Sequence, residues 1–193
     1  KQLLSFHSRL ALDAMNVMQA QLGRVVQALP ENTLGHLRQV PIWLELSVKS
    51  KITNAAAFYR SLRRGGADDG RIYPTEGSVV IREAQLFAYR TLAHPMLLLH
   101  ELAHAYHDQV LGLDHAGIRR HYLEAKKSGR YGNVPTVYGR RLPAYAMASE
   151  QEYFAELSEA YFGGNDFFPF KRDELQTFDP EMFELLVRLW EER

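Results

Sequence analysis

The chain has 193 residues, a length that fits one domain, residues 1–193, with a sizeable hydrophobic core. Lysine plus arginine and aspartate plus glutamate both number 23, so the net charge is zero, and neither a nucleic acid nor an anionic membrane is favoured as a partner. No apolar run is long enough to span a membrane, and the lack of cysteine excludes disulfides and cysteine-ligated metal sites.

The sequence begins at Lys1 instead of a methionine. On that ground we slightly favour a secreted or extracytoplasmic protein over a cytoplasmic one, although a chain without cysteine fits either compartment. The sequence leaves open whether a leader or a pro-segment was removed, and it leaves the oligomeric state open as well.

The first half of the chain predicts both helices and short strands. Its expected elements are a helix over residues 8–29, a strand over 40–48, a short helix over 55–62, a turn rich in Gly and Asp over 64–70, and two short strands within 71–81. We expect residues 79–81, or else 84–87, to form the sheet edge along which an extended substrate peptide lies. An interior strand is the competing interpretation of residues 79–81.

The second half of the chain predicts mainly helices. Its expected elements are helices over residues 95–110, 118–127, 149–163 and 179–190, and a loop over 129–143 rich in Gly, Pro, Tyr and Arg. Ser149 is a suitable N-cap for the third of these helices, and Gly163 is a suitable end. Together the elements predict a mostly helical α+β fold with a small mixed sheet.

The helix over residues 95–110 carries the pattern H-E-L-A-H at residues 100–104, which is the H-E-x-x-H signature of zinc sites. Residues four apart lie on one face of a helix, so His100 and His104 can hold one metal ion while Glu101 lies beside it. The surrounding residues are apolar, and burying two histidines and a glutamate among them is costly unless a metal compensates them.

A catalytic zinc usually has a third protein ligand. The metzincin pattern is excluded, because it needs glycine where this chain has His107 and histidine where it has Val110. His115 and His121 remain alternatives, although neither belongs to a specific motif. The helix over residues 149–163 places three glutamates on one face: Glu152, Glu156 and Glu159. A solvated acidic face would explain them, and a metal ligand at Glu152 would explain them equally.

These motifs carry a family resemblance. The pattern H-E-L-A-H at residues 100–104, then Tyr145, then E-Y-F-A-E at residues 152–156 resembles the catalytic core of the anthrax lethal factor-like peptidases, and is similar to the Mlc titration factor A group. Both are gluzincins with an H-E-x-x-H helix and an E-x-F-A-E helix. The resemblance covers roughly residues 95–168, and it implies a zincin-like catalytic domain.

The resemblance also implies a role for each matching residue. Glu152 would be the third ligand of one zinc ion per chain, and Glu156 would orient a ligand histidine from the outer shell. Tyr145 would steady the oxyanion, with Tyr138 as the second candidate. Zinc is favoured by the ligand types, although manganese, cobalt or nickel could occupy the same ligands.

The sequence therefore predicts a zinc metalloendopeptidase that acts on a peptide or protein substrate. Zinc with His100, His104 and Glu152 would polarise the scissile carbonyl and its water, and Glu101 would act as the base. Two alternatives stay open. One is a zincin-like binding or regulatory module that holds metal and cleaves little, and the other is a metal-free helical domain.

Overall fold

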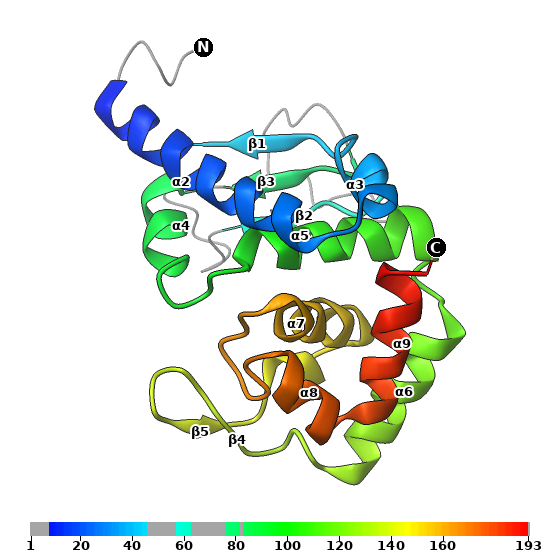
Figure 1. Cartoon of the computed structure of the whole chain (residues 1–193). Helices are drawn as coiled ribbons and strands as arrows, with labels where there is room; N and C mark the ends of the chain where they lie inside the picture. The colour runs from blue at the N-terminus through cyan, green and yellow to red at the C-terminus, as the bar shows by residue number, and fades with distance from the viewer. Residues whose placement is uncertain (1–7, 46–56, 63–75, 82, 193) are drawn as a thin grey trace.

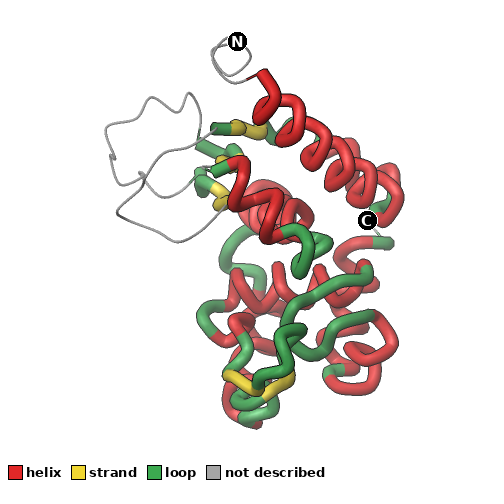
Figure 2. The backbone as a smooth tube through the Cα atoms, turned by 90° about the vertical axis from the view of Figure 1, so that its left-hand side faces the viewer, coloured by secondary structure: helices red, strands yellow, loops and turns green. Residues whose placement is uncertain are grey.

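The computed structural model describes residues 8–45, 57–62, 76–81 and 83–192, and these form a mostly helical α+β structure (Figures 1 and 2). In chain order the elements are α2 (Ser8–Ala28), α3 (Glu31–Leu37), β1 (Ile42–Leu44), β2 (Ala57–Tyr59), β3 (Val79–Ile81), α4 (Ala84–Arg90), α5 (Leu97–Tyr106), a π-helical turn (His107–Leu111), α6 (Ala116–Ser128), β4 (Val134–Pro135), β5 (Arg141–Leu142), a 3₁₀ turn (Tyr145–Met147), α7 (Glu150–Phe162), α8 (Arg172–Phe178) and α9 (Pro180–Trp190). None of the described helices is both long and apolar enough to cross a membrane.

The sheet has the strand order β1-β3-β2, with β1 parallel and β2 antiparallel to β3. All three residues of β3 are fully buried, as expected for a central strand. The expectation that residues 79–81 form a sheet edge is therefore wrong, and residues 84–87 belong to helix α4. Among the described strands, β2 is the edge that contacts α5.

The helix expected over residues 55–62 is also wrong, because residues 57–59 form strand β2. Tyr59 pairs with Val79 across the antiparallel ladder, and its hydroxyl donates a hydrogen bond of 3.1 Å to Asp108. The partner strand and Asp108 decide the backbone conformation here, and they override the weak helical pattern of the segment.

The longer predicted helices are confirmed as α2, α6, α7 and α9, while the short helices α3, α4 and α8 were not predicted. Of the strand expected over residues 40–48, residues 40–45 are described, and residues 42–44 form β1. The turn expected over residues 64–70, and the first of the two strands expected within 71–81, lie outside the described residues. The loop expected over residues 129–143 contains the two-stranded hairpin of β4 and β5.

Helix α5 lies between the sheet and α7 (Figure 1), and it contacts α2, α3, β2, β3 and α7. Because neighbours cover it from both sides, its apolar residues are buried almost all round the helix. The π-helical turn continues α5 as far as Leu111, and Gly112 ends it with a φ of 84°, which favours glycine. The helix expected over residues 95–110 is thus present, with a widened last turn.

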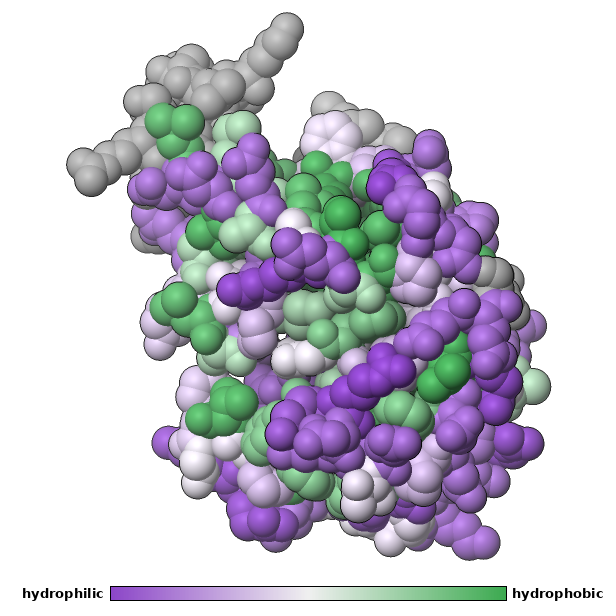
Figure 3. Space-filling model, viewed as in Figure 1, coloured by the Kyte–Doolittle hydropathy of each residue, from purple (hydrophilic) through white to green (hydrophobic). Residues whose placement is uncertain are grey.

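Trp190, the last residue of α9, is fully buried and packs against both α5 and α7. The indole stacks on Tyr106 from α5 with a centroid distance of 4.6 Å and on Phe154 from α7 at 5.5 Å. Its Nε1 donates a hydrogen bond of 3.0 Å to Ser158 Oγ. The face of the molecule seen in Figure 3 mixes polar and apolar residues.

Replacing Trp190 by Ala should lower the free energy of unfolding by about 3–5 kcal/mol, because the substitution leaves a large cavity between α5 and α7. Chemical denaturation followed by circular dichroism measures this change. Leu123→Ala on the exposed face of α6 is the control and should stay within about 0.5 kcal/mol of the wild type. Equal effects of the two substitutions would contradict the packing role of Trp190.

Candidate metal centre

Helices α5 and α7 run antiparallel, so their ligand-type residues meet in reverse order. His104 faces Glu152 near the start of α7, whereas His100 also reaches Glu159 near its end. The start of α7 is fixed by Ser149, whose hydroxyl accepts a hydrogen bond of 3.2 Å from the Glu152 backbone N–H. This cap places the Glu152 side chain in the first turn, opposite the two histidines.

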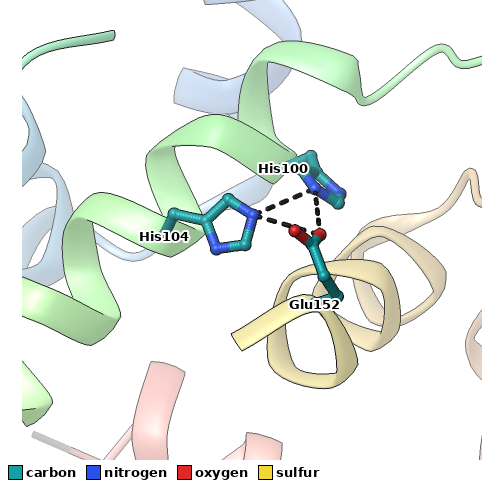
Figure 4. Close-up of side chains that lie close together, drawn as sticks. All are labelled: His100, His104 and Glu152. Carbon is teal, nitrogen blue, oxygen red and sulfur yellow. Dashed lines mark hydrogen bonds and ion pairs between the residues drawn. The ribbon is translucent and has the colours of Figure 1, made fainter. Parts of the chain in front are cut away.

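Three ligand-type atoms converge between these helices (Figure 4). The Nε2 atoms of His100 and His104 lie 3.1 Å apart, and Glu152 Oε2 lies 3.1 Å from the first and 3.3 Å from the second. Tetrahedral ligands with bonds of about 2.0–2.1 Å are separated from one another by about 3.3–3.4 Å. The three atoms therefore have nearly the spacing of ligands around one small ion.

The position of the hydrogen on the His100 ring explains why a positive charge between His100 Nε2 and the Glu152 carboxylate would be stabilising. Its Nδ1 lies 2.8 Å from Glu159 Oε1, and an ionised carboxylate can only accept, so Nδ1 carries the hydrogen. In the neutral ring this leaves a lone pair on Nε2 that faces the carboxylate of Glu152. Two lone pairs at that distance repel each other unless a cation or a proton lies between them. Two imidazole nitrogens and one carboxylate oxygen form a donor set that suits zinc.

The pKa shifts of His100 and Glu152 also show that positive charge is favoured between these side chains. Burial opposes the charged form of His100, yet hydrogen bonds with Glu152 and Glu159 raise its pKa well above the usual range. Partial burial acts to raise the pKa of Glu152, but hydrogen bonds with His100 and His104 outweigh it and lower that pKa strongly. A metal ion that binds here must displace a proton that the cluster holds tightly.

The resemblance implied that Glu156 orients a ligand histidine, but the carboxylate within hydrogen-bond distance of His100 is that of Glu159. Glu159 Oε1 lies 2.8 Å from His100 Nδ1, whereas Glu156 Oε1 lies 3.7 Å away, beyond hydrogen-bond distance. Burial and the neighbouring Glu159 raise the pKa of Glu156 well above its usual range, which favours the neutral acid. Both glutamates lie on the acidic face of α7, so the helical spacing alone could have suggested either of them.

The loop that follows α7, residues 163–170, lies beside the buried carboxyl groups of Glu156 and Glu159, and no role was predicted for it from the sequence. Asp166 Oδ2 lies 3.3 Å from His94 Nε2, just before α5 begins. Gly164 packs directly on the ring of Pro95, where any side chain would collide with the ring. The loop therefore ties the end of α7 to the start of α5, next to Glu159.

Glu101 is 6 % exposed and lies on α5 between the two histidines. Burial raises the pKa of its carboxyl, while the neighbouring His100 and His104 act in the opposite direction. A carboxylate with a raised pKa is a better proton acceptor near neutral pH, so this environment suits a general base.

Tyr145 stands at the exposed edge of the cluster, on the 3₁₀ turn before α7. Its hydroxyl lies 3.4 Å from Glu152 Oε1, and the side chain is half exposed. Burial, followed by the charge of Glu152, raises the pKa of this phenol, so it remains a hydrogen-bond donor. Tyr138 lies on the β4–β5 hairpin, where it lines a groove together with Leu92 and Phe170.

The two other histidines considered as third ligands have different surroundings. His115 caps helix α6, because its Nδ1 accepts a hydrogen bond of 3.2 Å from the Ile118 backbone N–H. His121 lies beside Glu124 and Arg120 on α6. Within the described part of the chain, the group that includes both His100 and His104 is completed by Glu152.

Comparison of the chain with protein-family models, with curated proteins and with solved structures finds no match. We therefore infer the function from the geometry and chemistry of this cluster.

Glu159→Gln should weaken zinc binding by about 10–100-fold, because the amide no longer holds the Nδ1 proton of His100 as a charged acceptor does. Competition with a fluorescent zinc chelator measures the affinity. Glu156→Gln is the matched comparison, and it should have the smaller effect because Glu156 lies outside hydrogen-bond distance. A larger loss in Glu156→Gln would contradict the assignment of Glu159.

Proposed function

We propose that this protein is a zinc-dependent metalloendopeptidase of the gluzincin type, with one zinc ion held by His100, His104 and Glu152. The observation that carries the proposal is the convergence of these three side chains with a buried Glu101 beside them. The resemblance of residues 95–168 to the lethal factor-like catalytic core supports the same reaction.

The bound zinc would act as a Lewis acid toward the scissile carbonyl and would acidify the attacking water. Glu101 accepts the proton of that water and delivers it to the departing amine. The raised pKa of Glu101 assists both transfers, because the carboxyl can exchange a proton near neutral pH. Glu159 keeps the ring of His100 in the tautomer whose Nε2 faces the site.

Tyr145 contributes a hydrogen bond to the tetrahedral oxyanion. Its hydroxyl is already within 3.4 Å of the ligand Glu152, and half of the side chain is exposed to an incoming substrate. A phenol with a raised pKa keeps its proton, so it can donate where negative charge develops.

The substrate peptide would lie along β2. This strand is an edge of the described sheet and contacts α5, whereas β3 is covered on both sides by β1 and β2. An extended peptide that adds to a sheet edge gains backbone hydrogen bonds in any sequence, so this placement predicts an endopeptidase with limited dependence on side chains at the paired positions.

Glu101→Gln should keep zinc and lower the rate of peptide cleavage by about 10²–10⁴-fold, because the amide cannot take up the proton of the water. A peptide-library screen, read by mass spectrometry beside the zinc content, measures both properties. Removal of zinc by a chelator should abolish cleavage by the wild type, and added zinc should restore it. Full activity of Glu101→Gln would refute the assignment of the base, and a wild type that holds zinc without cleaving would favour a metal-holding module.

Tyr145→Phe should lower kcat by about 10²–10³-fold while zinc affinity stays close to that of the wild type, because one oxyanion donor is lost. Tyr138→Phe is the matched control on the hairpin and should have little effect on kcat. If Tyr138→Phe causes the larger loss, then the hairpin tyrosine supplies the donor and Tyr145 does not.

A further inference from the structure

A second group of ligand-type side chains lies between α6 and α9. His121 from α6 is 6 % exposed, and its Nδ1 makes no hydrogen bond within the described part of the chain. That nitrogen lies 3.3 Å from Glu124 Oε2 on the same helix. Glu181 from the first turn of α9 completes the group, and the three ligand atoms all lie within 4.8 Å of one another.

The packing of the two helices explains why these residues meet. Gly117 of α6 brings the helix axes close together, because a Cβ at this position would lie 3.3 Å from Leu185 Cδ1 of α9. His121 lies one turn after Gly117, and Glu181 lies one turn before Leu185, so the antiparallel helices place them opposite each other. The group is thus set by the buried packing of α6 on α9, even though both carboxylates are exposed.

We propose that His121, Glu124 and Glu181 form a second site for a divalent transition-metal ion. One imidazole nitrogen and two carboxylate oxygens, with water in the remaining positions, suit zinc, cobalt or manganese better than the all-oxygen coordination that calcium prefers. The ion would bridge α6 and α9, and it would use none of the ligands between α5 and α7. The exposed carboxylates and the open water positions predict weaker binding than at the buried cluster.

Arg120 opposes binding in a way that can be measured. Its Nη2 lies 3.0 Å from His121 Nε2, and a guanidinium only donates, so the neutral ring carries its hydrogen on Nδ1. A metal ion on Nδ1 requires that this proton leaves and that Nε2 becomes the protonated nitrogen. The exposed side chain of Arg120 must then turn away. Removing Arg120 should therefore tighten binding.

Zinc titration of the full chain, with bound metal counted by mass spectrometry after equilibrium dialysis, tests the site. The wild type should bind two equivalents. Glu124→Gln and Glu181→Gln should each lose the more weakly bound zinc equivalent, or bind it at least about tenfold more weakly. The loss of a ligand should cost at least as much affinity as the loss of a residue that only orients a ligand. Glu184→Gln, an exposed change one turn further along α9, is the matched control and should keep both equivalents.

Three further measurements separate this site from the first. His104→Ala should lose the tighter equivalent and keep the weaker one. Arg120→Ala should bind the weaker one more tightly than the wild type. The second equivalent should raise the thermal unfolding temperature of the wild type but not that of Glu181→Gln, because the ion binds only the folded helix pair. A single equivalent at saturating zinc that His104→Ala removes, or a second one unaffected by Glu124→Gln and Glu181→Gln, would overturn the proposal.

Discussion

The packing of α5 against α7 is the constraint on which the candidate site depends. His100 uses both nitrogens of its ring, because Nδ1 meets Glu159 at 2.8 Å and Nε2 faces Glu152 at 3.1 Å. One histidine can face two glutamates seven residues apart only when the helices run side by side for about two turns. The core around Trp190 and the close approach of Gly164 to Pro95 hold the helices in this arrangement.

The same packing places several acidic groups in the interior. Four carboxyl groups near the ligands are buried, and they belong to Glu101, Glu156, Glu159 and Asp166. Burying a carboxylate is costly unless positive charge or hydrogen bonds compensate it. Among the described residues, one carboxyl oxygen of each of the last three side chains makes no hydrogen bond: Glu156 Oε2, Glu159 Oε2 and Asp166 Oδ1. A protein tolerates this cost mainly where function requires it. A cation bound at His100 would lower the cost of burying these carboxylates, because its positive charge attracts their negative charge.

The parts of the fold and of the candidate site that depend on neighbouring residues in the sequence, through helical spacing and helix capping, could be predicted. The H-E-x-x-H spacing places His100 and His104 on one face of any helix, and Ser149 and Gly163 mark the ends of α7 through backbone rules that hold in most folds. The parts decided by distant partners could not be predicted. Residues 57–59 are a strand because β3 pairs with them, although the local pattern favours a helix.

The choice between Glu156 and Glu159 shows the same limit within the site. Both residues lie on the face of α7 that carries Glu152, so helical periodicity gives no preference. Only the antiparallel offset of α5 decides which carboxylate reaches Nδ1 of His100, and that offset depends on the packing of side chains far from the motif.

The central claim is that His100, His104 and Glu152 together hold one zinc ion tightly. The most direct test is the zinc content of the wild type and of Glu152→Ala after exhaustive dialysis against metal-free buffer, with Glu150→Ala as the control on the same turn of α7. We expect one tightly bound zinc per chain in the wild type and in the control, and none in Glu152→Ala. A wild type that retains no zinc after loading, or a Glu152→Ala variant that retains as much, would contradict the central claim.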